Sequence, residues 1–228
     1  MSFMEKTLRE TVADYEVHIS MSYQEYVDTF DEDVHAEWVH GEAIIFMSAA
    51  TRHQDLVTFL MKLLGIYIEF FQLGKLYSAP YEMKPFPSSN AREPDILFVK
   101  SENKHLLEEQ RLAGAADLII EVVSPESVKR DNEDKFTEYE AAGVKEYWIV
   151  DSRSEHQTVE FWVLDESGHY QSMPVVNNTY YSTVLPGFWL NTSWLWDTEQ
   201  YGALAAFAQI AGLPQEMVDL LRGGDKYT

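Results

Sequence analysis

Two strongly apolar runs in the middle of the chain each have an acidic residue among their apolar positions. Residues 94–100 begin with Pro94 and Asp95, and residues 117–124 hold Glu121 between apolar neighbours. Runs this apolar are typical of strands that are buried on both faces. An ionised carboxylate in such a strand is costly unless it is paired or binds a metal ion. The sequence therefore predicts a buried sheet that has to accommodate two carboxylates.

Helical periodicity on both sides of these strands gives a mixed α/β (α+β) pattern. Apolar residues recur at helical spacing after Thr51, and Gly74 is placed to end that helix. Residues 127–142 form a second predicted helix, closed by Gly143, and residues 146–150 form a further strand. The central order is helix, strand, strand, strand, helix, strand, which predicts a mixed central sheet flanked by helices.

The segments outside this core predict smaller features of one domain. Residues 1–19 show no clear period and are interpreted as an N-terminal arm, so the single domain spans residues 20–228. Ser22 and Glu25 have the spacing of a capping box, which predicts a short helix. The other predicted features are a hairpin over residues 38–48 turning at His40 and Gly41, a hairpin turn at Gly168, and one or two C-terminal helices over residues 198–221.

The composition restricts the class of protein. The chain has no cysteine, which excludes disulfides, thiolate nucleophiles and cysteine-based zinc sites. No run approaches the roughly 18 apolar residues of a membrane span, and the N-terminus lacks an apolar signal-peptide core. We therefore expect a cytoplasmic protein without membrane contact.

The distribution of charge bears on nucleic-acid binding. The net charge of −21 argues against broad electrostatic attraction to nucleic acid. However, 12 of the 17 Lys and Arg residues lie within residues 51–150, the segment that carries both strand carboxylates. This distribution allows a local contact with nucleic acid. The alternative is that the acidity only keeps the protein soluble.

Asp95 and Glu121 are the expected metal ligands. If their strands are neighbours, the carboxylates can share a magnesium or manganese ion; the alternative is an ordinary buried ion pair for each. Lys135 lies on the next helix with Asp131 and Tyr139 four residues to either side, so the three share one face. From there, Lys135 could stabilise charge on a phosphate oxygen or position water. The alternative is an exposed pair with Asp131 worth about 0.3–0.5 kcal/mol.

Three further polar residues are weaker candidates for the site. His53 lies near the start of the long helix, where it could orient a water or a phosphate because helix N-termini favour anions. It could equally be an exposed polar residue. Glu42 is either a further acidic group of the site or a solvent-facing strand residue. The same two alternatives apply to Glu37, which is the weaker candidate of the two.

Several short motifs extend from about residue 20 to about residue 195. They are Trp38-Val39-His40-Gly41-Glu42, His53, Pro94-Asp95-Ile96, Glu121-Val122-Val123-Ser124-Pro125, Asp131, Lys135, Tyr139, Gly143-Val144-Lys145-Glu146-Tyr147-Trp148 and Leu185-Pro186-Gly187. Together they resemble the Uma2 family, also described as a domain of unknown function abundant in cyanobacteria. The Glu-Val-Val-Ser-Pro stretch with Gly-Val-x-Glu-Tyr-Trp is the most specific part.

The resemblance implies a restriction-endonuclease-like PD-(D/E)XK fold, in which a Pro-Asp and a Glu-x-Lys hold the metal ion and position water. Pro94-Asp95 matches the first half, and Glu121 matches the acid of the second, but Val123 occupies the lysine position. The resemblance implies that Lys135 supplies this charge from the following helix. His53 and Glu42 also match family positions.

These expectations favour a magnesium- or manganese-dependent endonuclease that hydrolyses DNA. One alternative is a non-catalytic binding or scaffolding module that keeps the fold. Another is hydrolysis of RNA or a different phosphodiester, because no base-reading motif separates the substrates. A homodimer would suit double-strand cleavage, which needs two sites related by symmetry, and the apolar segment 204–221 could form its interface. Alternatively, this segment covers the domain's own sheet.

Overall fold

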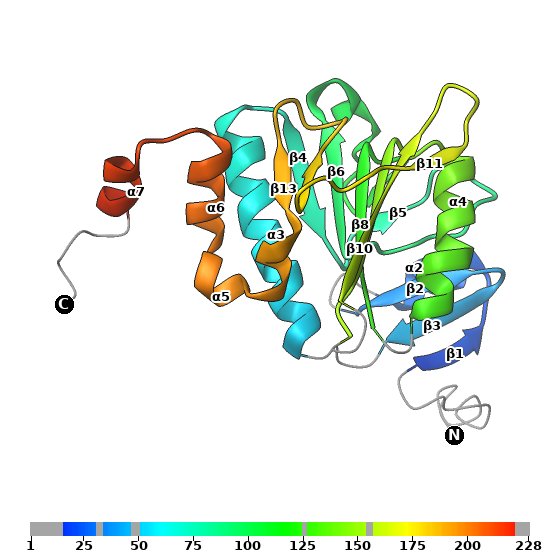
Figure 1. The fold of residues 1–228 in the computed structure, drawn as a ribbon. Helices are drawn as coiled ribbons and strands as arrows, with labels where there is room; N and C mark the ends of the chain where they lie inside the picture. Colours follow the sequence, from blue (N-terminus) through cyan, green and yellow to red (C-terminus); the bar gives the residue numbers. More distant parts are fainter. Residues whose placement is uncertain (1–15, 31–33, 47–50, 125–126, 154–156, 222–228) are drawn as a thin grey trace.

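A six-stranded mixed sheet lies at the centre of the molecule (Figure 1). The structure, a computed structural model, describes residues 16–30, 34–46, 51–124, 127–153 and 157–221. The strand order is β11-β10-β9-β8-β6-β4, in which β8 and β9 run parallel and the other neighbours antiparallel. The strands are β4 (Gly74–Ser78), β6 (Ile96–Lys100), β8 (Leu118–Val123), β9 (Glu146–Asp151), β10 (Thr158–Leu164) and β11 (Tyr170–Ser172).

Helices cover both faces of this sheet, as the sequence predicts. They are α3 (Thr51–Phe70), with α6 (Ala203–Ile210) outside it, on one face, and α4 (Lys135–Ala142) on the other (Figure 1). In β8, Ile120 and Val122 belong to the apolar cluster under α3, whereas Ile119 and Val123 belong to the cluster under α4. Because successive side chains of a strand point to opposite faces, Glu121 faces the α4 side.

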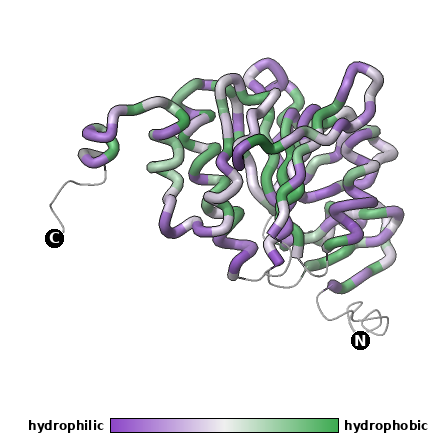
Figure 2. The backbone as a smooth tube through the Cα atoms, viewed as in Figure 1, coloured by the Kyte–Doolittle hydropathy of each residue, from purple (hydrophilic) through white to green (hydrophobic). Residues whose placement is uncertain are grey.

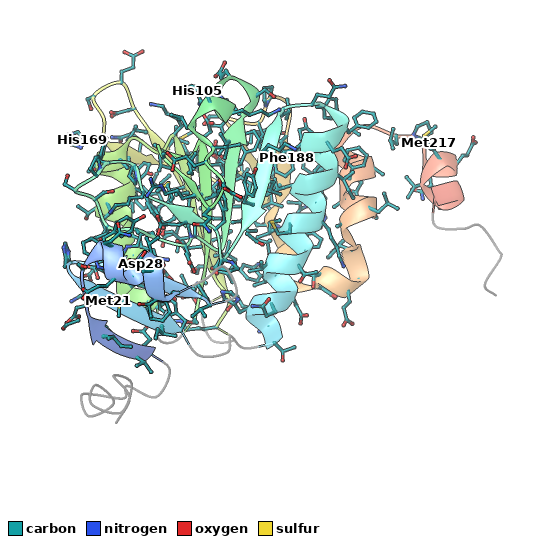
Figure 3. All side chains as sticks on the ribbon, turned by 180° about the vertical axis from the view of Figure 1, so that it is seen from behind. Met21, Asp28, His105, His169, Phe188 and Met217 are labelled. Carbon is teal, nitrogen blue, oxygen red and sulfur yellow. The ribbon has the colours of Figure 1, made fainter. Side chains whose placement is uncertain are left out.

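Hydropathy follows this layering. Figure 2 shows the central strands and much of α3 and α6 in hydrophobic colours, and the peripheral loops in hydrophilic colours. Seen from behind, side chains fill the space between α3 and the sheet, where Phe188 lies (Figure 3). The Phe188 ring packs edge-on against Tyr67 of α3 at a centroid distance of 5.0 Å. The core is therefore a continuous aromatic and aliphatic layer under α3.

A second, three-stranded sheet lies beside the N-terminal end of α4 (Figure 1). Its order is β1-β3-β2, and its elements, with the helix beside them, are β1 (Glu16–Ser20), β2 (Ala36–Val39), β3 (Glu42–Phe46) and α2 (Tyr23–Thr29). The predicted capping box of Ser22 and Glu25 is present, and His40 and Gly41 turn the hairpin with φ of 50° and 89°. The prediction of an arm over residues 1–19 is wrong at its end, because residues 16–19 pair with β3; residues 1–15 lie outside the described residues.

The end of α3 differs from the prediction. Gln72 adopts the left-handed conformation (φ 55°) after the helix, and the Leu73 N–H donates to the Ile68 carbonyl at 3.0 Å. Gly74 instead begins β4. A Cβ atom at this position would lie 2.1 Å from the Val99 carbonyl oxygen of β6. Gly74 is therefore required by the close approach of two strands and does not end the helix.

The remaining elements are short, and residues 198–221 form three helices, α5, α6 and α7, in place of the one or two predicted. They are β5 (Glu82–Met83), β7 (Arg111–Leu112), β12 (Thr179–Tyr181), β13 (Trp189–Asn191), the 3₁₀ helices Ser101–Leu106 and Thr192–Trp196, the π turn Arg130–Asp134 before α4, α5 (Thr198–Tyr201) and α7 (Gln215–Leu221). The helix α6 packs on α3, so residues 203–210 cover a helix and not the sheet directly, whereas α7 stands away from the body (Figure 1). Among the described residues, no helix has the length and apolarity of a membrane span.

Candidate active site

Asp95 and Glu121 meet where β6 and β8 separate. The pairing of the two strands ends at Ile96 opposite Ile120, which confirms that the strands are neighbours. Beyond this point, Asp95 Oδ2 accepts a 2.7 Å hydrogen bond from the Val122 N–H. The Asp95 N–H in turn approaches Glu121 Oε2 at 3.5 Å. Because each carboxylate contacts the backbone of the other strand, the two acids are held together at one edge of the sheet.

Lys135 reaches these acids from α4. Its Nζ donates to Glu121 Oε1 at 2.8 Å and lies 3.0 Å from Glu37 Oε1. Only 3% of Lys135 is exposed, so the alternative of an exposed pair with Asp131 is wrong; Asp131 is also buried, with Oδ1 3.7 Å from the lysine. The Tyr139 hydroxyl donates to the same Glu121 oxygen at 2.8 Å, a contact that the sequence did not predict. The predicted shared face of Asp131, Lys135 and Tyr139 is therefore turned towards the acids.

Of the two hairpin glutamates, Glu37 belongs to this cluster and Glu42 does not. Glu37 is 1% exposed and accepts from Arg92 Nη1 at 2.9 Å, in addition to its contact with Lys135. The side chain of Glu42 is 49% exposed and lies 3.5 Å from His18. The structure therefore corrects the expectation that Glu42 adds an acidic group to the site. The expectation that Glu42 is the stronger candidate of the two is therefore wrong, and Glu37 is the glutamate that contacts Lys135.

His53 contacts Asp95 from the first turn of α3. Its Nε2 lies 3.2 Å from Asp95 Oδ2, and the residue is buried, so the alternative of an exposed polar residue is wrong. Burial alone would lower the pKa of His53, but the hydrogen bond and the charge of Asp95 raise it above the usual value. The other ring nitrogen, Nδ1, is buried without a partner among the described residues. His53 thus orients Asp95 and keeps one polar atom for a further group.

The cluster contains more carboxylates than its immediate cations balance. Burial raises the pKa of Glu121 to about 8, and the nearby charges of Asp131, Asp95 and Glu37 add to this effect against the opposing effect of Lys135. Burial would also raise the pKa of Glu37, but Lys135 and Arg92 hold it well below the usual value. Asp131 has a raised pKa because of burial. Glu121, the acid nearest to Asp95, is therefore disfavoured as a free carboxylate, and an added cation would favour its ionisation.

The donor set of this edge fits a small divalent cation. Among the described residues, no group of three or more His, Cys, Asp and Glu side chains is arranged so that it could hold a metal ion. Magnesium does not require such a group, since it is usually held by one or two carboxylates together with waters and substrate phosphates. Asp95 and Glu121 are two such carboxylates, and burial, together with the charges of the neighbouring acids, raises the pKa of Glu121. These two residues could therefore hold magnesium or manganese.

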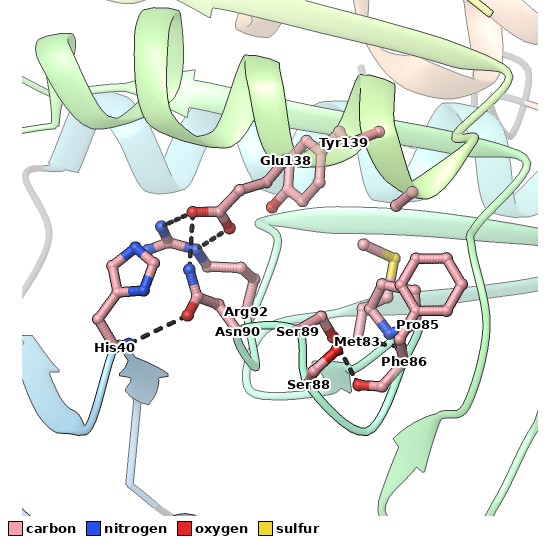
Figure 4. A pocket seen from close by; sticks show the side chains of 12 residues that line it. His40, Met83, Pro85, Phe86, Ser88, Ser89, Asn90, Arg92, Glu138 and Tyr139 are labelled. Carbon is pink, nitrogen blue, oxygen red and sulfur yellow. Dashed lines mark hydrogen bonds and ion pairs between the residues drawn. The ribbon is translucent and has the colours of Figure 1, made fainter.

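A pocket of about 220 Å³ lies next to Arg92 and Glu138 (Figure 4). Arg92 and Tyr139 line it and separate it from Glu37 and Glu121. Arg92 also forms a bidentate pair with Glu138, through Nη2 to Oε1 at 2.6 Å and Nε to Oε2 at 2.8 Å. Neither of the two strand-edge acids lines the pocket. The pocket is therefore distinct from the candidate metal site, and its wall residues Arg92 and Tyr139 hold the two glutamates that contact Lys135.

The mixed central sheet flanked by helices is of the restriction-endonuclease-like class. The chain belongs to the Uma2 family, described as "Putative restriction endonuclease", which matches residues 22–193. The resemblance noted from the sequence is thus confirmed. Val123, which occupies the lysine position of the motif, is fully buried in the core under α4, and Lys135 brings the ammonium group to Glu121.

Solved structures support the fold. The structure is similar to that of "a putative nuclease belonging to DUF820" from Anabaena variabilis, with a TM-score of 0.61 and 13% identity over 84% of this chain and 99% of that one. At this identity the similarity concerns the fold alone. No curated protein matches the chain in sequence.

Proposed function

We propose that the protein is a metal-dependent endonuclease that hydrolyses phosphodiester bonds of DNA, with Asp95 and Glu121 holding magnesium or manganese. The observation that carries the proposal is the buried Lys135 ammonium, 2.8 Å from one oxygen of Glu121, while the other Glu121 oxygen faces Asp95. A divalent cation bound there would provide Lewis-acid stabilisation of charge developing on the phosphate.

The side chains around this position have separate roles in the proposal. Lys135 and Tyr139 fix Glu121 by donating to one oxygen, so the second oxygen stays directed at the cation. His53 and the Val122 N–H fix Asp95 in the same way. The positive charge of Lys135 also stabilises negative charge that builds up on the phosphate in the transition state.

The choice of DNA rests on the family description and on the local balance of charge. A protein with a net charge of −21 does not attract nucleic acid over its whole surface. Phosphate binding is then confined to the place where cations and a metal ion meet, which is the candidate site. Double-strand cleavage would require two such sites, and a homodimer related by a two-fold axis is part of the proposal.

Plasmid cleavage tests the proposal. Supercoiled DNA is incubated with the protein and magnesium or manganese, with EDTA as the control, and nicked and linear products are measured. We expect Asp95→Asn, Glu121→Gln and Lys135→Met to reduce cleavage by about a hundredfold or more, and Glu133→Gln, an exposed acid before α4, to leave it unchanged. Nicking that survives Asp95→Asn would refute the assignment.

Calorimetric titration of magnesium separates the proposed enzyme from a scaffold that only keeps the fold. Binding to the wild type that is lost in Glu121→Gln supports the metal site independently of the substrate. If the wild type binds no magnesium and cleaves neither DNA nor RNA, the non-catalytic alternative holds. Cleavage of RNA in place of DNA would keep the site and change the substrate.

A further inference from the structure

The cations Lys135, Arg92 and Arg130 surround the buried carboxylates. The first two are fully engaged in ion pairs and cannot contact a substrate directly. Lys135 is enclosed by Glu37 and Glu121, and it is 3% exposed. Arg92 is 3% exposed and uses three of its nitrogens on Glu37 and Glu138. Neither can contact a phosphate without breaking these ion pairs. A nuclease site of this kind needs another cation to hold the substrate backbone.

The contacts of Arg130 make it the candidate for this cation. It precedes Asp131 in the π turn, and its Nε lies 3.8 Å from Asp131 Oδ1, the same oxygen that lies 3.7 Å from Lys135 Nζ. Both Arg130 Nε and this oxygen are buried without a hydrogen bond among the described residues. The guanidinium therefore lies one carboxylate away from the lysine of the site but is not saturated by that carboxylate.

The outer part of Arg130 is held in place while remaining accessible. Its Nη1 donates to Glu16 of β1, and its guanidinium lies over the Phe46 ring at 4.5 Å. Nη2 has no hydrogen bond within the described part of the chain, and 18% of the side chain is exposed. The His35 ring packs on the same Phe46 ring at 4.8 Å, and 41% of its side chain is exposed. Phe46 thus contacts two nitrogen-bearing side chains that are both partly exposed.

We propose that Arg130, with His35 beside it on Phe46, is a phosphate-binding subsite that takes a DNA backbone phosphate next to the scissile one. This proposal rests on the proposed function. An arginine fork matches the geometry of phosphate oxygens, and stacking on a ring fixes the plane of the fork. The contact with Glu16 occupies one edge of the fork, so Glu16 competes with the phosphate for the arginine.

DNA binding without cleavage tests the subsite. Anisotropy of a short fluorescein-labelled DNA duplex is measured in EDTA, where no metal-dependent hydrolysis occurs. We expect Arg130→Ala to raise the Kd by about tenfold to a hundredfold, as the loss of a charge-assisted hydrogen bond would do. The same substitution should reduce the slope of log K against log salt concentration by about 1. Lys62→Ala, which removes an exposed charge from the middle of α3, is the matched control. Glu16→Gln should lower the Kd several-fold, and more than Glu133→Gln does.

Several outcomes would overturn the subsite. Equal Kd values for Arg130→Ala and Lys62→Ala would do so, as would equal effects of Glu16→Gln and Glu133→Gln, or a wild type that does not bind the duplex. If Arg130→Ala does not fold, Arg130→Lys keeps the charge and removes the fork, and it should still weaken binding. A wild type that cleaves plasmid while Arg130→Ala binds normally refutes the subsite alone. Duplex binding that depends on Arg130 without any cleavage by the wild type refutes the proposed nuclease activity alone.

Discussion

Replacing Glu121 with glutamine should change how the stability of the protein depends on pH. The substitution keeps the shape of the side chain, and the amide oxygen can still accept from Lys135 and Tyr139 as Glu121 Oε1 does. It removes the one carboxyl of the cluster whose pKa is raised to about 8, chiefly by burial. The variant therefore isolates the contribution of this ionisation to folding.

The sign and size of the effect follow from the pKa of Glu121. Its usual value is 4.5, so between about pH 4.5 and pH 8 the folded wild type binds a proton that the unfolded chain has released. The contribution of Glu121 to stability is complete below this window, and it is lost as the pH rises through it. Each pH unit within the window costs about 1.4 kcal/mol. From about pH 5.5 to about pH 7.5, the wild type should lose about 2–3 kcal/mol relative to Glu121→Gln.

Urea unfolding, followed by tryptophan fluorescence in EDTA, measures this difference at the two pH values. Glu133→Gln controls for the removal of an acid in general. A difference between wild type and Glu121→Gln that is independent of pH, or that moves in favour of the wild type as the pH rises, would refute the reasoning. Magnesium should restore the stability of the wild type at the higher pH and leave the variant unchanged, because a cation binds the ionised carboxylate.

Three further substitutions have distinct expected outcomes in urea unfolding. Lys135→Met removes the cation shared by buried carboxylates, so the free energy of unfolding should fall by about 3–5 kcal/mol; a loss below about 1 kcal/mol would contradict the buried network. Glu146→Ala deletes a fully buried carboxylate that accepts from an indole and from two backbone N–H groups, which should cost about 2–4 kcal/mol without changing magnesium affinity in calorimetry. Gly74→Ala should destabilise by about 2 kcal/mol or more because its Cβ would lie 2.1 Å from a backbone oxygen, whereas Gly65→Ala, with open space in α3, should stabilise by about 1 kcal/mol; equal stabilities would refute this contrast.

The order of the central elements was predictable because its signals are local. Continuous apolar runs identified the strands of Asp95 and Glu121, and a period of 3.6 residues identified the helices on either side. Local turn chemistry placed the hairpin at His40 and Gly41, and the capping box was predicted from Ser22 and Glu25, which stand three positions apart. Such features depend only on neighbours in the sequence, so they can be predicted before the fold is known.

Features that depend on distant contacts were predicted less well. Gly74 had the spacing of a helix terminator, but its actual constraint is a carbonyl of β6, a strand that comes later in the chain. The strand β1 has little pattern of its own and exists because β3 offers it a partner. In both cases the deciding contact is made by a segment that local periodicity does not identify.

The sequence by itself determined that two acids interrupt apolar strands and that a lysine, an aspartate and a tyrosine share one helix face. Only the tertiary structure decided that this face meets these acids, that Glu37 and not Glu42 completes the contacts of Lys135, and that Arg130 remains unsaturated beside them. The reason is physical: burial makes each charge depend on partners that sheet pairing and helix packing bring together. The cost of an unpaired buried charge then decides which acids lie in the cluster, and this cost cannot be read from the sequence alone.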